Sequence, residues 1–187
     1  LDGRMEMQGG FWAETDTNIP SGESLIRQAL YGRRFIKEEF DQDMKICWLP
    51  DCFGFNGNLP QILRGCGMEY FSTIKLAWNK VNQFPHHSFY WQGIDGSRVL
   101  AHMPPEGDYN SAAGPKNVLK ASNNYKEKEL DIALLVFGGG DGGGGPQENH
   151  IEVLRRQQNR AGLPWVRFGR ALEFFRRLAV SNVKHVY

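Results

Sequence analysis

Short apolar segments of strand type alternate along this chain with longer segments of helical periodicity. The first helical segment begins near Ser21, a residue that can cap a helix, and its apolar residues recur at helical spacing through Phe40. The run at 45–49 ends at Pro50 and is typical of a buried strand. Such alternation predicts an α/β fold, with a mostly parallel sheet covered by helices as an open sheet or a barrel.

The rest of the chain continues this pattern. We predict helices over residues 58–65, 115–129, 147–160 and 169–179. We predict strands over residues 70–74, 131–137, 164–168 and 182–187, and 131–137 has the strongest apolar run. Segments 88–92 and 97–101 flank the dipeptide Asp95-Gly96, which predicts a hairpin turn between two strands.

Charge and composition exclude several classes of protein. The 22 Lys and Arg residues against 21 Asp and Glu residues give a formal net charge of +1, without the basic excess of proteins that bind nucleic acids or anionic membranes. The sequence is 41% hydrophobic and 23% charged, which is a globular composition. No run approaches the roughly 18 apolar residues of a membrane span. From the charge balance and the lack of such a run, we expect neither nucleic acid nor membrane as a partner.

The cysteines indicate the redox compartment of the protein, and the first residues indicate how the given sequence relates to a longer protein. Cys47, Cys52 and Cys66 fit no zinc or Cys-x-x-Cys spacing, which favours free thiols in a reducing compartment. The sequence starts at Leu1 without an initiator Met or an apolar leader. We therefore expect a section of a longer protein without a signal peptide.

Asp51 directly follows the predicted strand 45–49. This is the carboxyl end of the strand, where sheets of parallel strands place their chemistry. An ionised carboxylate buried there needs a partner, which can be a metal, an Arg or Lys side chain, or a set of backbone N–H groups. The alternative is an aspartate that only caps the following turn.

A glycine-rich loop follows the predicted strand 131–137, and seven of the 22 glycines lie in it, within residues 138–145. A phosphate-binding loop would end in Gly-Lys-Ser/Thr, but Gly145 is followed by Pro146 and Gln147. A flexible linker does not suit a run between a strand and a helix. We therefore interpret the loop as a platform on which a bulky ligand can reach Asp141.

Two aspartates after different strands, a glycine platform and 12% aromatic residues are together the components of a glycoside hydrolase site. In such sites one carboxylate attacks the sugar or activates water, and the other protonates the leaving oxygen. We expect Asp51 and Asp141 to share these roles, with carboxyl groups about 5–5.5 Å apart if the reaction retains the anomeric configuration.

Five motifs, in order along the whole chain, resemble glycoside hydrolase family 38, and most of all its cytosolic and bacterial α-mannosidase branch. They occupy residues 9–24, 48–55, 59–63, 84–97 and 140–146. The resemblance implies a cytoplasmic, retaining α-mannosidase that acts on α-mannoside oligosaccharides. It also implies that residues 1–187 are a section of an N-terminal catalytic domain, a seven-stranded α/β barrel. Because a section of a barrel exposes strand edges and apolar helix faces, we expect the chain to aggregate or to form oligomers, such as a homo-oligomer.

The resemblance also implies roles for individual residues. Asp51 corresponds to the nucleophile, which in the family also binds a divalent ion, usually Zn²⁺, with Co²⁺ or Ca²⁺ as alternatives. Asp141 corresponds to the general acid/base. Phe53 would pack under the sugar, and Lys75 and Tyr109 would contact the substrate.

Other metal ligands of the family lie outside this sequence. Members carry an upstream His-x-Asp motif and a further downstream His, whereas zinc needs three or four protein ligands and Asp51 supplies one. We therefore expect the isolated chain to bind zinc poorly and to be inactive, with a non-catalytic carbohydrate-binding remnant as the alternative. His86 and His87 point opposite ways if their segment is extended, so we expect structural roles for them and a surface or core role for His185.

Overall fold

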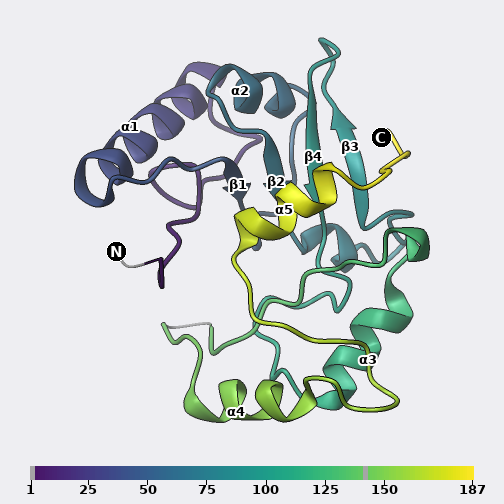
Figure 1. Ribbon diagram of the computed structural model, residues 1–187. Coiled ribbons are helices and arrows are strands. Elements are labelled where there is room, and N and C mark those ends of the chain that lie inside the picture. The colour runs from purple at the N-terminus through teal and green to yellow at the C-terminus, as the bar shows by residue number, and fades with distance from the viewer. Residues whose placement is uncertain (1–2, 141–142) are drawn as a thin grey trace.

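The computed structural model describes residues 3–140 and 143–187 (Figure 1). Its central sheet has four strands in the order β1-β2-β4-β3. These are β1 (Ile46–Trp48), β2 (Tyr70–Ser72), β3 (Ser88–Gln92) and β4 (Arg98–His102). β1, β2 and β4 are parallel, and β3 pairs antiparallel with β4 as the predicted hairpin. The expected α/β fold with a mostly parallel sheet is confirmed.

The first helix, α1 (Gly22–Phe40), begins and ends as its sequence predicts. Ser21 caps it, because its hydroxyl accepts a hydrogen bond from the N–H of Ser24 at 3.2 Å. The helix ends at Asp41, whose φ of 52° lies in the left-handed region. Its buried residues recur every three or four positions, at Leu25, Ala29, Gly32 and Ile36.

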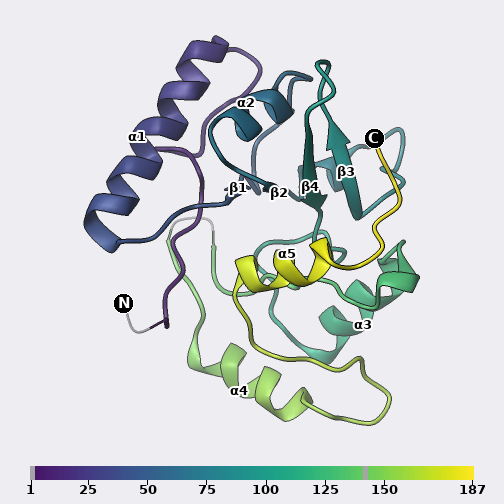
Figure 2. The same cartoon turned by 45° about the horizontal axis from the view of Figure 1, so that its top comes forward.

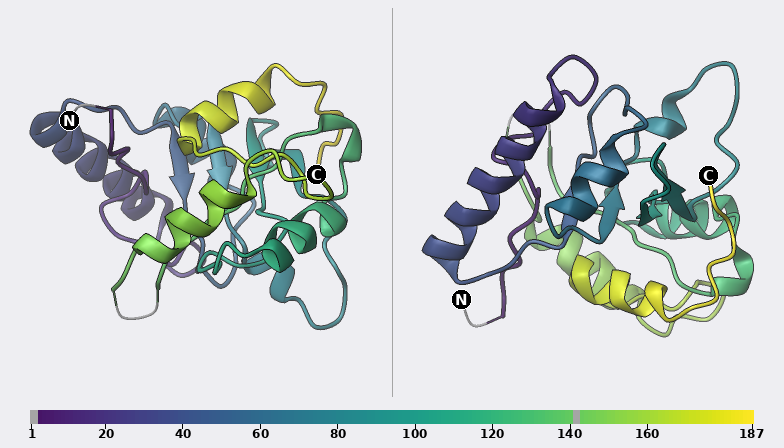
Figure 3. Two further views of the ribbon diagram at one scale, coloured as in Figure 1. Left: turned by 60° about the horizontal axis from the view of Figure 1, so that its bottom comes forward. Right: turned by 90° about the horizontal axis from the view of Figure 1, so that it is seen from above.

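Helices cover both faces of the sheet. α1 and α2 (Leu59–Gly65) pack on one face and α5 (Ala171–Ala179) packs on the other, as the view from above shows (Figure 3). Successive strand side chains alternate between the faces. One core therefore contains Cys47, Phe71, Ala101, Leu25 and Leu63, and the other contains Ile46, Tyr70, Leu100, Phe175 and Leu178.

Two further helices, α3 (Pro115–Asn124) and α4 (Glu148–Gln157), lie beyond the carboxyl ends of the parallel strands (Figures 1 and 2). Short 3-10 turns η1 (Lys75–Trp78) and η2 (Lys128–Leu130) follow β2 and α3. Across residues 3–140 and 143–187, no helix has both the length and the apolar character that a membrane span requires.

Three of the predicted strands are wrong. Segment 131–137 makes a single parallel bridge, between Phe137 and Ser111, and segment 182–187 makes one between Val186 and Tyr90 of β3. Segment 164–168 is irregular. An apolar run indicates burial, but a strand also needs a neighbouring backbone to pair with, and segments 131–137 and 164–168 instead line a groove of about 700 Å³. The described sheet therefore has four strands, and a seven-stranded barrel is not seen.

The parallel strands end at one edge of the sheet, which we call the carboxyl edge. Loops 49–58, 73–87 and 103–114 leave this edge after β1, β2 and β4. Because β1, β2 and β4 are adjacent, the three loops start side by side. They carry Asp51, Lys75 and Tyr109, so the topology gathers three of the predicted site residues at one edge.

Candidate active site

Hydrogen bonds at the peptide group between Pro50 and Asp51 hold Asp51 in place at the carboxyl edge. The N–H of Ile74 donates to the carbonyl of Pro50 at 3.3 Å, which ties this loop to the one that follows β2. The N–H of Asp51 donates to Oε1 of Glu14 at 2.8 Å. The main chain of Asp51 is therefore fixed by neighbours from two other segments.

The partner of the Asp51 carboxylate is Lys75, the first residue of η1. The Lys75 ammonium forms an ion pair with Oδ1 of Asp51, and the two side chains are 8% and 37% exposed. The Lys75 Nζ also lies 3.4 Å from the ring centroid of Trp78 and 5.0 Å from that of Phe53. Of the partners considered for a buried aspartate, the structure therefore supplies a lysine, which two aromatic rings flank.

Both of these rings are open to solvent, since Phe53 is 84% exposed and Trp78 is 61% exposed. Large exposed aromatic side chains beside a carboxylate make an unusual surface, because apolar area of this kind is normally buried. They provide flat apolar faces next to a charged pair, which is suited to a ligand with both apolar and polar faces.

A second segment, residues 12–18, lies against the Asp51 loop. The hydroxyl of Thr17 donates to the carbonyl of Gly54 at 2.9 Å, and Sγ of Cys52 donates to the carbonyl of Thr15 at 3.0 Å. Gly54 has a φ of +140°, and a Cβ there would lie 2.6 Å from Nδ2 of Asn18. The positive φ favours glycine at position 54, and a larger residue there would also displace the Asn18 side chain.

Segment 12–18 also brings negative charge to the site. Burial, together with the nearby charges of Glu14, Asp16 and Asp51, raises the pKa of the Cys52 thiol to about 11. Backbone N–H groups of Ile19 and Asn18 donate to Oδ1 of Asp16 and lower its pKa. Sequence reasoning did not single out Glu14 as a contact of Asp51, because 37 positions separate the two residues.

Tyr109 is half-buried in the loop after β4. The same loop lies along the segment that leads to Asp141, because Ser111 is bridged to Phe137 and a Cβ at Gly140 would come within 1.9 Å of Oδ1 of Asn110. Asp141 itself lies outside the described residues. The structure thus brings Asp51, Phe53 and Lys75 together and places Tyr109 beside the segment leading to the second predicted acid.

The loop after β4 contains a buried acid that the sequence analysis did not identify. Glu106 is 3% exposed, and its Oε1 accepts a hydrogen bond from Nδ2 of Asn117 at 2.6 Å. Its Oε2 is buried and has no hydrogen-bond partner among the described residues. Burial in a loop gives no sequence signal of its own, so only the structure identifies this carboxylate.

The described residues around Asp51 do not by themselves form a zinc site. Within residues 3–140 and 143–187, Asp51 belongs to no group of three His, Cys, Asp or Glu donors close enough to share an ion. Its Oδ1 already contacts the cation of Lys75. Since zinc needs three or four protein ligands, this part of the chain supplies at most one of them at Asp51.

The sequence matches the description "Glycosyl hydrolases family 38 N-terminal domain" over residues 1–186. It is 46% identical over 185 residues to "Alpha-mannosidase G" of Dictyostelium discoideum, and the aligned residues make up 98% of this chain and 17% of that protein. It is 45% identical over 171 residues to "Alpha-mannosidase 2C1" of Homo sapiens, covering 91% of this chain and 16% of that protein. The chain thus spans about a sixth of the length of these relatives.

A solved structure has the same fold. The crystal structure of an alpha-mannosidase from Enterococcus faecalis superposes with a TM-score of 0.67 over 95% of this chain and 21% of that one, at 13% sequence identity. The sheet and its covering helices are therefore shared, although few residues are identical. Together with the match over residues 1–186, this shows that the chain belongs to glycosyl hydrolase family 38, within its N-terminal domain.

Proposed function

We propose that this chain is the section of an α-mannosidase that carries both catalytic carboxylates. The observation that carries the proposal is the Asp51–Lys75 ion pair between the exposed rings of Phe53 and Trp78, at the carboxyl edge of the sheet. Support also comes from relatives about 45% identical that are named alpha-mannosidases. The substrate would be a terminal α-linked mannose of an oligosaccharide.

The proposed reaction is a double displacement with retention. A carboxylate oxygen of Asp51 forms a bond to C1 of the mannose while the bond from C1 to the leaving oxygen breaks and Asp141 gives that oxygen its proton. Water then attacks C1, passes a proton to Asp141 and releases Asp51. Lys75 positions Asp51 by holding Oδ1, and Phe53 and Tyr109 would contact the sugar.

A divalent ion on Asp51, with Zn²⁺ as the first choice and Co²⁺ or Ca²⁺ as alternatives, stays part of the proposal for the longer protein. Such an ion would polarise hydroxyl groups of the sugar. The described residues provide one ligand for it, so the other ligands would have to come from outside them. The two displacement steps above use only Asp51 and Asp141.

The remaining expectations extend the same proposal. We infer that the four-stranded sheet is part of a seven-stranded catalytic barrel, that the protein is cytoplasmic, and that homo-oligomers can form. The isolated chain would be inactive, because residues outside it would complete the site.

Kinetics of the longer protein on an aryl α-mannoside test the proposal. Asp51→Asn should lower kcat/KM by about 10³-fold or more, as expected when a nucleophile is lost. Asp141→Asn should impair substrates with poor leaving groups most, because these need protonation. Asp41→Asn, at the exposed end of α1, is the control and should stay active.

NMR of the first anomer released tests the stereochemistry, and retention requires the α-anomer. Full activity of the Asp51→Asn protein, or release of the β-anomer, would contradict the mechanism. Mannose binding without hydrolysis by the wild-type protein would instead support the alternative of a carbohydrate-binding remnant.

A further inference from the structure

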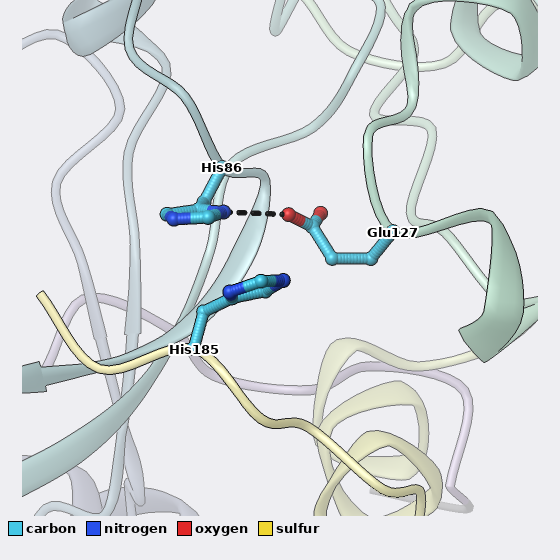
Figure 4. A group of neighbouring side chains, drawn as sticks. All are labelled: His86, Glu127 and His185. Atoms are coloured by element: carbon cyan, nitrogen blue, oxygen red, sulfur yellow. Dashed lines mark hydrogen bonds and ion pairs between the residues drawn. The ribbon is translucent and has the colours of Figure 1, made fainter.

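Three side chains from distant parts of the sequence meet away from the candidate active site. They are His86, which lies just before β3, Glu127, which lies just before η2, and His185, which lies near the end of the chain (Figure 4). One ligand atom from each lies within 4.8 Å of the others. Both imidazole rings turn a nitrogen toward the carboxylate of Glu127 (Figure 4).

The carboxylate of Glu127 is held rigidly. It is 2% exposed, and its Oε2 accepts hydrogen bonds from the N–H groups of His87 and Ser88, both at 3.0 Å. Its Oε1 faces Nδ1 of His86 at 3.1 Å. Backbone donors therefore fix one oxygen and leave the other directed at the imidazoles, which is how outer hydrogen bonds orient a metal-binding carboxylate.

The backbone of β3 fixes the position of His185. The N–H of Tyr90 donates to the carbonyl of His185 at 2.8 Å, and the N–H of Tyr187 donates to the carbonyl of Tyr90 at 2.9 Å. The ring of His185 stacks on that of His86 with centroids 4.0 Å apart and planes 22° apart. Backbone pairing and ring stacking therefore hold the two imidazoles side by side, next to the carboxylate of Glu127.

We propose that His86, Glu127 and His185 bind a divalent transition-metal ion of the Zn²⁺ class. Two imidazoles and one carboxylate are a known zinc ligand set, with water in the fourth position. Donors on a tetrahedral zinc ion lie about 3.3 Å apart, given bonds of about 2.0–2.1 Å, and the 3.1 Å between Nδ1 of His86 and Oε1 of Glu127 is close to this. The third ligand atom, on the half-buried His185, lies within 4.8 Å of the other two, so this ring would turn toward the ion when it binds.

This site shares no residue with the proposed catalytic machinery at Asp51. The expectation that the isolated chain binds zinc poorly was drawn from Asp51 alone, and this second site would replace it. The bound ion would connect the segment before β3, the start of η2 and the segment 182–187. The last of these is otherwise joined to the sheet by its pairing with the edge of β3. The ion would therefore fasten the end of this chain to the sheet.

Titration calorimetry of the metal-free 187-residue chain with ZnCl₂ tests this proposal. We expect one ion per chain, and affinity lowered at least tenfold in both His86→Ala and His185→Ala, since even indirect loss of ligand support costs about 10–100-fold. The control is His150→Ala, which removes a histidine from α4 outside this cluster. Circular dichroism checks that each variant is folded. If the chain alone is unfolded, the same variants are compared in the longer protein, which then also carries Asp51→Asn.

Two further readouts separate this site from other zinc-binding groups. The Co²⁺ form should show tetrahedral d–d absorption without an intense thiolate band, which excludes binding by the cysteines. Asp51→Asn should leave the affinity unchanged, so failure of the proposed catalytic function would not affect this result. Absence of 1:1 binding, or affinity unchanged in both His86→Ala and His185→Ala, would overturn the proposal.

Discussion

The ammonium of Lys75 forms an ion pair with the carboxylate of Asp51 and so joins the loops that follow β1 and β2. The lysine side chain is 8% exposed, while the aspartate side chain that it holds is 37% exposed. Lys75 therefore orients Asp51 from the buried side and leaves the aspartate open toward solvent. This relationship places a fixed, accessible carboxylate at the carboxyl edge.

Replacing Lys75 with methionine removes the cation while keeping much of the side-chain volume. We expect the free energy of unfolding to fall by about 1 kcal/mol, since the pair is only partly buried. In the longer protein we expect kcat to fall, and KM to change by a smaller factor. Lys75→Arg should restore part of kcat. Urea unfolding and steady-state kinetics measure both effects. Lys80→Met, at an exposed lysine of the same loop, is the control, and equal behaviour of the two methionine variants would contradict a positioning role.

Trp78 is predicted to contribute to sugar binding and little to folding. Because its side chain is 61% exposed, Trp78→Ala should change the free energy of unfolding by less than about 0.5 kcal/mol while raising KM for an aryl α-mannoside several-fold. The matched control is Trp165→Ala, since Trp165 is 65% exposed and lines the groove beside α5 instead. A KM that rises equally in both variants would rule out a specific role for Trp78.

Gly32 lets α1 pack directly on the backbone that leads to Glu14. A Cβ at Gly32 would lie 2.5 Å from the carbonyl carbon of Phe11 and 2.5 Å from the nitrogen of Trp12. Gly32→Ala should therefore destabilise the fold by about 1–3 kcal/mol or more. Gly65→Ala, at the end of α2 with open space around it, should be neutral or stabilising by up to about 1 kcal/mol. Thermal unfolding compares the two, and equal melting temperatures would contradict the close approach.

Acid should destabilise the protein through two buried histidines. Burial lowers the pKa of His87 from its ordinary 6.5 to about 4, and burial lowers the pKa of His102 well below 6.5. Both rings act as acceptors, because the N–H of Lys126 donates to Nδ1 of His87 at 3.3 Å and the N–H of Leu134 donates to Nε2 of His102 at 3.2 Å. The neutral form is therefore the one that the folded chain holds.

The direction in which stability changes with pH follows from the protons that the unfolded chain takes up. As the pH falls below 6.5 the unfolded chain binds these protons and the folded chain does not, so the stabilisation present above pH 6.5 is lost toward pH 4. For His102 the loss approaches about 1.4 kcal/mol per pH unit. Urea unfolding between pH 7 and pH 4.5 measures this slope, which should be shallower in His102→Gln and unchanged in His150→Gln. A stability independent of pH over this range would contradict the buried neutral histidines.

Local patterns predicted much of the fold. Ser21 and the apolar spacing after it predicted α1, and Asp95-Gly96 predicted the β3–β4 hairpin. The run 131–137 was misassigned as a strand, because periodicity does not reveal whether a partner backbone lies beside it. In the structure this run pairs only at Phe137, among the described residues, and lies along a groove.

The site was predictable to a similar degree. The position of Asp51 after a strand located it at the carboxyl edge, and a cationic side chain was among the partners considered for it. The contact with Glu14 and the grouping of His86 with His185 depend on pairing between distant segments. His185 reaches His86 only because residues 185–187 lie along β3, and no local motif encodes that pairing.

The most direct test of the central claim is to trap the covalent intermediate on the longer protein with a fluorinated mannosyl fluoride, which slows release of the sugar from the enzyme. Peptide mass spectrometry then locates the added sugar. The account predicts a fluoromannosyl ester on Asp51, in the peptide that follows β1, and no label in Asp51→Asn. A stable sugar ester on any other carboxylate, with Asp51 unmodified, would contradict it.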